Sequence, residues 1–202
     1  MKKLDEIFTI GYSSFGIEKF VEVLKKYVIT ALIDVRSIPV SAHFPEFNQK
    51  NLSPVLRKND IIYRNYDKEF GARQLNTEFF TDGVLDFAKF SVSKQFLDGV
   101  NKIEKGMELG YKFALMCAEK RPEECHRCIL VAKKFHELGY NVKHILEDGS
   151  YITQADVEKI LVKKYFPDYN QIFLFERPNM AEMIRQSYLK RNLEIGYRLS
   201  ED

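Results

Sequence analysis

Short apolar runs alternate with amphipathic stretches along most of the chain. The runs that have the length and patterning of strands are 7–10, 31–35, 61–64, 111–116 and 142–146. Between them, apolar residues recur at helical spacing in segments 17–24, 84–109 and 125–138, the second of which breaks near Ser91. This alternation predicts an α/β fold, a single layered domain with a mostly parallel sheet flanked by helices.

The last quarter of the chain is predicted to add a helical extension. Thr153 is a candidate N-cap for a helix over 153–165, and a second helix is expected over 179–193, after a strand-like run at 172–175. We place the α/β domain at residues 1–150 and a C-terminal extension, packed on the same domain, at 151–202. Because the extension holds eight basic and eight acidic residues, it is no basic tail. We expect it to support a homo-oligomer.

Two local patterns in the first third of the chain allow further predictions. Ser14 is a plausible N-cap for the first helix. Residues 37–51 lack regular periodicity and are predicted to form a long loop, followed by a short helix over 54–58. The spacing of the first two strands is typical of a βαβ unit, so we expect them to be parallel.

Composition limits the classes of function. Of 202 residues, 45% are hydrophobic, and 31 basic against 29 acidic side chains leave a net charge of +2, so no broad basic surface for duplex nucleic acid is expected. No stretch approaches the roughly 20 apolar residues that span a bilayer, so we expect no membrane partner. Three cysteines, an odd number, and no apolar run at the start favour a reduced, cytoplasmic protein.

The segment 115–128 holds the densest group of reactive side chains. Cys117 ends an apolar strand, Glu119 follows it, and Cys125, His126 and Arg127 open the next helix. In open α/β sheets ligands bind at the carboxyl ends of strands, where helix N-termini also point. This strand-to-helix turn is therefore the leading candidate for a functional site.

Other polar residues follow the neighbouring predicted strands. We expect one polar cleft with four candidate catalytic residues, Cys117, Glu119, Cys125 and His126. Its candidate substrate-binding residues are Ser13, Asp34, Arg36, Tyr63 and Arg127. Arginines favour an anion, so the expected partner is an anionic small molecule or a nucleic-acid group.

Three motifs occur in one order along the chain, namely 9–13 (TIGYS), 34–39 (DVRSIP), and 117–119 (CAE) with 125–127 (CHR). Together they resemble the family called domain of unknown function 488, over roughly residues 8–145. The family name implies no reaction. The chain departs from the family pattern at Tyr12, where histidine is common, and at Ala42, where arginine is common.

A weaker resemblance is to rhodanese-type sulfurtransferases, which also have an Asp-Val-Arg strand end and a later strand that ends in cysteine. Three functions therefore stay open. The first is an enzyme acting on a phosphate- or nucleotide-like substrate. The second is a rhodanese-like sulfurtransferase or thiol-redox enzyme, and the third is a non-catalytic module that binds nucleic acid or protein.

The three cysteines and His126 could in principle supply the four ligands of zinc. However, Cys128 lies on the apolar stripe of its predicted helix, which favours core packing, and no second paired motif is present. The spacing Cys125-x-x-Cys128 is by itself a weak redox signal. We therefore expect no metal and no cofactor.

Overall fold

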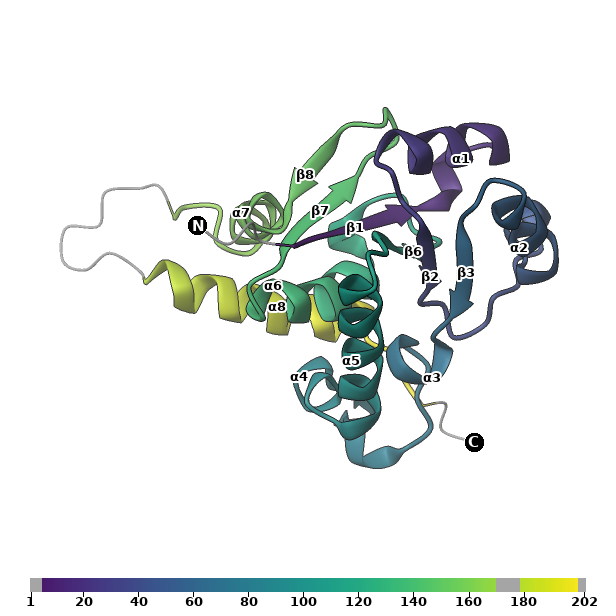
Figure 1. Ribbon diagram of the computed structural model, residues 1–202. Coiled ribbons are helices and arrows are strands. Elements are labelled where there is room, and N and C mark those ends of the chain that lie inside the picture. The colour runs from purple at the N-terminus through teal and green to yellow at the C-terminus, as the bar shows by residue number, and fades with distance from the viewer. Residues whose placement is uncertain (1–4, 170–178, 200–202) are drawn as a thin grey trace.

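A computed structural model of the chain describes residues 5–169 and 179–199 and shows a layered α/β fold (Figure 1). Its main sheet has six strands in the order β3-β2-β6-β1-β7-β8. Their bounds are β1 Glu6–Gly11, β2 Ala31–Asp34, β3 Ile62–Asn65, β6 Phe113–Cys117, β7 Asn141–Ile145 and β8 Tyr151–Thr153. All neighbouring pairs are parallel except β7 with β8. The predicted fold class is confirmed.

Helices cover both faces of this sheet and enclose two cores. On one face, α1 (Ile17–Lys26) and α2 (Gln49–Arg57) bury a smaller core, which we call the α1/α2 core. On the other face lies a larger core built with α3 (Asp67–Phe70), α4 (Phe87–Ser91), α5 (Lys94–Glu108), α6 (Lys133–Glu137), α7 (Gln154–Tyr165) and α8 (Met180–Ile195). Because strand side chains alternate between faces, β1, β2, β3, β6 and β7 each contribute to both cores.

The N-terminal βαβ unit differs from the simplest expectation. β1 and β2 are parallel in the same sheet, but β6 lies between them and pairs with both. Ser14 does not cap α1, since it lies in a short 3₁₀ turn and Gly16 precedes the helix. The segment predicted as a loop to residue 51 becomes helical at Gln49, because Leu52 and Leu56 are fully buried in the α1/α2 core.

Two corrections concern the predicted central helices. Val84–Leu85 is not helical but forms β5, which pairs with β4 (Phe80–Thr81) in a separate hairpin. The helix that follows Cys125 is wound as a π-helix over Arg127–Ala132 before α6 begins. Leu138, expected on its buried stripe, is 48% exposed, because the helix ends one residue earlier. The break near Ser91 is confirmed between α4 and α5.

The C-terminal helices pack against the large core. Thr153 and Asp156 form a capping box at the start of α7, as the sequence predicted for Thr153. β8, the first element of the predicted extension, pairs with β7. The predicted strand-like run at 172–175 lies outside the described residues.

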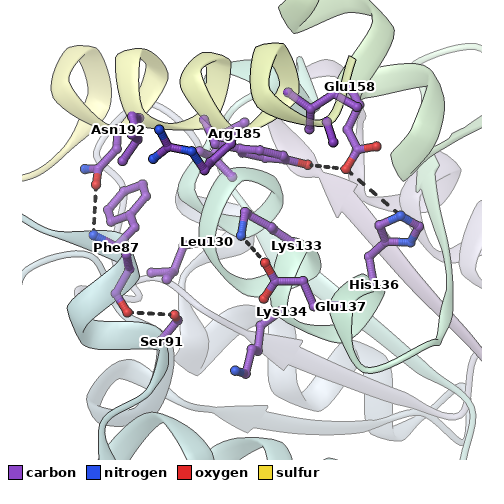
Figure 2. Close-up of a pocket in the computed structure, with 16 residues that line it drawn as sticks. Phe87, Ser91, Leu130, Lys133, Lys134, His136, Glu137, Glu158, Arg185 and Asn192 are labelled. Atoms are coloured by element: carbon purple, nitrogen blue, oxygen red, sulfur yellow. Dashed lines mark hydrogen bonds and ion pairs between the residues drawn. The ribbon is translucent and has the colours of Figure 1, made fainter. Parts of the chain in front are cut away.

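A cavity of about 380 Å³ lies between α8, α4 and the helical segment 127–137 (Figure 2). Asn192 at one end accepts a hydrogen bond from the backbone of Phe87, and Glu158 at the other accepts one from Tyr188. Lys133 and Glu137 form an ion pair on the helical segment. Lys133, Glu137 and Glu158 of this wall are thus engaged within it.

Within residues 5–169 and 179–199, no helix combines the length and apolar character that crossing a membrane requires.

Candidate functional site

The candidate site lies where β1 and β6 end side by side. Gly11 pairs with Cys117 in the parallel register, and the loop after β6 then passes directly over Gly11. A Cβ atom on residue 11 would lie 1.9 Å from the carbonyl oxygen of Glu119. Only glycine permits this close approach, so the end of β1 shapes the loop that carries Glu119.

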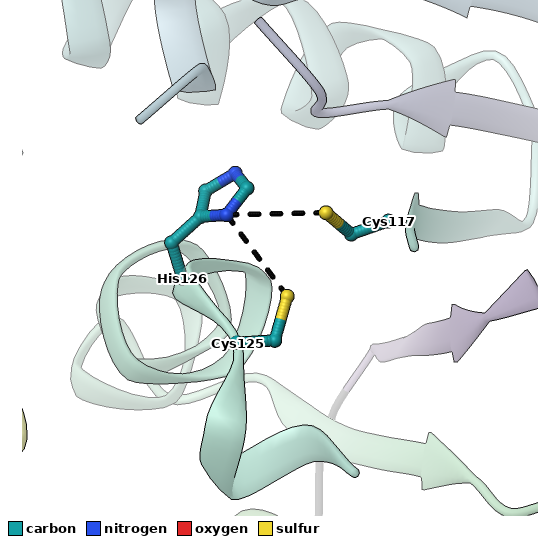
Figure 3. A group of neighbouring side chains, drawn as sticks. All are labelled: Cys117, Cys125 and His126. Atoms are coloured by element: carbon teal, nitrogen blue, oxygen red, sulfur yellow. Dashed lines mark hydrogen bonds between the residues drawn. The ribbon is translucent and has the colours of Figure 1, made fainter. Parts of the chain in front are cut away.

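Cys117, Glu119, Cys125, His126 and Arg127 come together here, and we call these five residues the thiol centre. The sulfur of Cys125 lies 2.8 Å from Oε2 of Glu119. Nδ1 of His126 lies 3.9 Å from the sulfurs of both Cys117 and Cys125, and Figure 3 shows the imidazole facing the two thiols. On its other side, Nε2 of His126 donates a hydrogen bond to the carbonyl of Val35 at 2.9 Å.

Arg127 lies beneath these groups and is completely buried. Its Nη1 and Nη2 donate to the carbonyls of Glu119 and Lys120 at 2.5 and 3.3 Å. Its Nε is buried without a hydrogen-bond partner among the described residues. No carboxylate of the described chain lies within ion-pair distance of this guanidinium. The charge of Arg127 therefore acts on the sulfurs and on the Glu119 carboxyl nearby.

The two thiols of the centre differ in acidity. Burial opposes ionisation of Cys125, but the hydrogen bond from Cys117 and the positive charges of Arg127 and His126 outweigh it and lower the pKa of Cys125. The same hydrogen bond, together with burial, raises the pKa of Cys117. Both side chains are about 98% or more buried, at 2% exposure for Cys117 and 1% for Cys125. The first sulfur to carry negative charge is therefore Cys125.

The neighbouring acid and base are shifted toward holding protons. Burial, followed by the negative charge of Cys125, raises the pKa of Glu119. For His126, burial lowers the pKa, but contacts with Cys125 and the charge of Glu119 outweigh it and raise the pKa. The 2.8 Å contact between Cys125 and Glu119 thus joins a thiol whose pKa is lowered to a carboxyl group whose pKa is raised.

Asp34 and Arg36 lie elsewhere, although both follow β2. Arg36 makes a bidentate ion pair with Asp34, with Nη2 to Oδ2 at 2.6 Å, and also donates to the hydroxyl of Tyr12 and the carbonyl of Phe47. Tyr63 donates to the same carboxylate at 2.6 Å. Their partners Tyr12, Phe47 and Tyr63 belong to the α1/α2 core, whereas Cys117 and Cys125 belong to the large core on the opposite face. The predicted single cleft is therefore two separate groups.

Ser13 lies beside the thiol centre but is tied to it through its backbone. Its N–H donates to the carbonyl of Ala118 at 3.1 Å, so this donor is used within the fold. Of the predicted site residues, the structure thus brings together Cys117, Glu119, Cys125, His126 and Arg127, with Ser13 adjacent. Asp34, Arg36 and Tyr63 form the second group.

The model of the family described as "Domain of unknown function DUF488" matches residues 16–133, which is more than half of the chain. The chain belongs to the DUF488 family. The matched part contains β2, β6 and the whole thiol centre, whereas Gly11 and Ser13 precede it. No curated protein and no solved structure matches the chain, and the likeness to rhodanese-type sulfurtransferases is not shown by any comparison.

In this DUF488 chain the third cysteine is separate from the thiol centre. Cys128 is fully buried, and its sulfur lies 3.7 Å from Nε2 of His144 and 3.8 Å from Oε1 of Gln154. Burial raises its pKa far above the usual range. The sequence spacing Cys125-x-x-Cys128 therefore does not describe the pair of sulfurs that the fold brings together.

Some residues that shape the DUF488 site were not found from the sequence. Gly11 could have been found, because a glycine directly after a strand often marks close backbone approach. The Val35 carbonyl that orients His126 left no sequence signal, since any residue supplies a carbonyl. The ligand atoms of Cys117, Cys125 and His126 all lie within 4.8 Å of one another, a grouping that is able to hold a metal ion.

Proposed function

We propose that this DUF488 protein is an enzyme whose reaction centre is the thiol centre, with the sulfur of Cys125 present as a thiolate. One observation carries the proposal. A fully buried guanidinium, Arg127, lies against two thiols and has no carboxylate partner in the described chain. A buried positive charge requires a nearby negative one, and the Cys125 sulfur is the thiol beside it whose pKa is lowered.

A purely structural role accounts poorly for this arrangement. Removing a charge from water costs several kcal/mol, and replacing buried ionic groups by well-packed apolar ones is often neutral or stabilising. In the same turn Glu119 is exposed as a residue, but its carboxyl group is desolvated beside the thiols, which raises its pKa. Groups held in such costly positions cluster at sites of catalysis.

The centre combines the parts that thiolate chemistry needs. Cys125 begins the helical turn in which the backbone N–H of Arg127 donates to its sulfur at 3.4 Å. Glu119, in contact with that sulfur, is a proton donor and acceptor for the reaction. A thiolate with an adjacent acid and a fixed cation is the activated form of a cysteine nucleophile. Rhodanese-like sulfur transfer would be one case of this chemistry.

A phosphate- or nucleotide-like substrate has weaker support. Arg36 directs its donors at Asp34, Tyr12 and Phe47, and Arg127 directs both terminal nitrogens at backbone carbonyls. Arg127 is fully buried and Arg36 is 6% exposed, so neither guanidinium is open to an anion from solvent. The same burial argues against a nucleic-acid surface built on these arginines, because phosphate contacts need exposed cations.

Site-resolved alkylation tests the proposal. The purified chain, reduced and treated with chelator, is labelled at neutral pH with iodoacetamide, and each cysteine is followed by mass spectrometry. Arg127→Met keeps the bulk but removes the charge, and Arg121→Met, at an exposed arginine of the same loop, is the matched control. We expect the rate at Cys125 to fall about tenfold or more in Arg127→Met, as for a pKa change of about one unit or more.

Cys128 in the same chain is the internal standard for a buried, protonated thiol. Circular dichroism verifies that each variant is folded. An equal Cys125 rate in the native chain and in folded Arg127→Met would show that no thiolate depends on this cation and would reject the proposed reaction centre.

A further inference from the structure

We infer that the thiol centre binds one zinc ion, held by Sγ of Cys117, Sγ of Cys125 and Nδ1 of His126, with the fourth position open beside Glu119. The inference rests on the proposed function, because it assigns a ligand to the same thiolate. It departs from the expectation, drawn from the sequence, that no metal is bound.

The distances fit a tetrahedral ion. Zinc–sulfur bonds are about 2.3 Å and zinc–nitrogen bonds about 2.0–2.1 Å, so tetrahedral angles place a sulfur and a nitrogen about 3.6 Å apart. The structure has both sulfurs at 3.9 Å from Nδ1 of His126. All three ligand atoms lie within 4.8 Å of one another. Each needs to move by only a few tenths of an ångström to bind a common ion.

The surroundings fix these ligands in the required orientation. Nε2 of His126 donates to the Val35 carbonyl, so Nδ1 is the ring nitrogen that faces the two sulfurs (Figure 3). A metal-bound histidine characteristically donates its second ring nitrogen to a carbonyl or carboxylate in this way. The backbone N–H of Arg127 donates to the Cys125 sulfur and holds it in place.

The donor set selects the kind of ion. Two thiolates and one imidazole suit zinc, whereas magnesium and calcium prefer oxygen ligands. Two thiolate charges offset the two charges of the ion. Three protein ligands with one open position are typical of catalytic zinc rather than structural zinc.

Glu119 has a specific place in this arrangement. Its carboxyl lies 2.8 Å from the Cys125 sulfur but outside the group of three convergent ligand atoms. It is therefore a neighbour of the open position rather than a fourth ligand. A carboxylate there is placed to accept a proton from a water molecule at that position.

Cobalt substitution tests the site on the native chain. The reduced full-length protein is stripped with chelator and titrated with Co²⁺, whose visible bands report tetrahedral geometry and whose sulfur-to-cobalt charge-transfer band reports thiolate ligands. We expect saturation at one ion per chain, tetrahedral bands, charge-transfer intensity for two thiolates, and displacement by Zn²⁺. Absence of tetrahedral bands, or octahedral binding without charge transfer, would overturn the inference.

Alanine variants assign the ligands. Cys117→Ala and Cys125→Ala are each expected to halve the charge-transfer intensity or abolish binding, and His126→Ala to weaken binding by about tenfold or more, in line with the loss of a metal contact. Cys128→Ala is the matched control, because Cys128 is equally buried and lies in the same segment. Loss of the cobalt spectrum in Cys128→Ala alone would overturn the assignment.

The outcomes separate this inference from the proposed function. Metal binding together with Arg127-dependent alkylation of Cys125 in stripped protein, blocked on adding zinc, supports both. Alkylation without metal binding rejects the zinc site and leaves the thiolate. If metal binds but the alkylation rate of Cys125 is the same in the native chain and in Arg127→Met, the zinc site is supported and the proposed thiolate is rejected.

Discussion

At the scale of single residues, the thiol centre depends on a few close approaches. Gly11 permits the Glu119 carbonyl to cross the end of β1, and the same carbonyl accepts a hydrogen bond from the buried Arg127. The position of Arg127 therefore depends on a residue that has no side chain. This coupling explains how the ends of two strands and one loop can hold a buried cation against two sulfurs.

Gly11→Ala should disrupt this arrangement. The added methyl group would lie 1.9 Å from the Glu119 carbonyl oxygen and 3.1 Å from Nη2 of Arg127, so the loop must move. We expect the free energy of unfolding to fall by about 3 kcal/mol, the upper end for overpacking. Denaturant unfolding measures the change.

Gly16→Ala is the control for that substitution, because the nearest atom to its Cβ is 3.9 Å away. Gly16→Ala should change the free energy of unfolding by no more than about 0.5 kcal/mol, as at other unconstrained surface sites. Equal effects at the two glycines would contradict the role assigned to Gly11.

At the scale of secondary-structure elements, a buried chain of hydrogen bonds links four of them. Thr9 of β1 bonds Nδ1 of His144 of β7 at 2.8 Å, and Nε2 of His144 bonds Gln154 of α7 at 2.8 Å. Gln154 then donates to the hydroxyl of Tyr188 of α8 at 2.7 Å. Because every member is satisfied, this chain fixes how α7 and α8 lie on the sheet.

His144 should make stability depend on pH. Burial, followed by the positive charge of Arg127, lowers the pKa of His144 to about 3. In the unfolded chain it titrates near 6.5, so below that pH the unfolded state binds a proton that the folded state refuses. The free energy of unfolding that neutral His144 contributes is fully present above pH ~6.5. It falls by about 1.4 kcal/mol per pH unit as the pH drops toward about 3.

The measurement is urea unfolding of the native chain and of His144→Gln between neutral and mildly acidic pH. The difference between their slopes isolates the histidine from the carboxyl groups that titrate lower. His43→Gln, at an exposed histidine, controls for the substitution itself. Parallel pH profiles for the native chain and His144→Gln would show that His144 is not held neutral.

At the scale of the whole molecule, α8 closes the large core through specific contacts. The side chain of Asn192 accepts a hydrogen bond from the backbone of Phe87 at 2.8 Å (Figure 2). It also donates one to the carbonyl of Leu85 at 2.8 Å. These bonds join α8 to α4 and to β5. The C-terminal helix is thus anchored to an element more than a hundred residues earlier in the chain.

Asn192→Ala should loosen this attachment. It would leave a buried N–H and a buried carbonyl without their partners, at a cost of about 1–3 kcal/mol. Leu193→Ala, at the adjacent and 58% exposed position, should change stability by no more than about 0.5 kcal/mol. Thermal unfolding of both variants tests this, and similar midpoints would contradict the anchoring role of Asn192.

The sequence predicted the elements better than their arrangement. Periodic apolar residues located the long strands and most of the long helices of the described chain, because burial imposes the spacing of apolar residues directly. The start of α2 at Gln49 was predicted as loop. The order of strands was not predictable, since the insertion of β6 between β1 and β2 depends on contacts some eighty residues apart. The hairpin β4–β5 was missed because strands of two residues are too short to show an alternation of apolar and polar residues.

The candidate site was predicted in part for a similar reason. Cys117, Glu119, Cys125, His126 and Arg127 are close in sequence, so one strand-to-helix turn brings them together. Asp34 was predicted with them, but the structure places its carboxylate against Arg36 and Tyr63, because the face of a strand residue depends on register. The structure pairs Asp34 with Met116, which precedes Cys117 by one residue. Successive residues of a strand point to opposite faces of the sheet, so Asp34 and Cys117 are on opposite faces.

The central claim is that the folded protein carries one negatively charged sulfur, on Cys125, beside Arg127. The most direct test is the ultraviolet absorbance that distinguishes a thiolate from a thiol, measured at neutral pH on metal-free native protein and on Cys125→Ser. We predict that the native chain shows the absorbance of one thiolate and that Cys125→Ser shows none. Equal absorbance in both proteins would contradict the account.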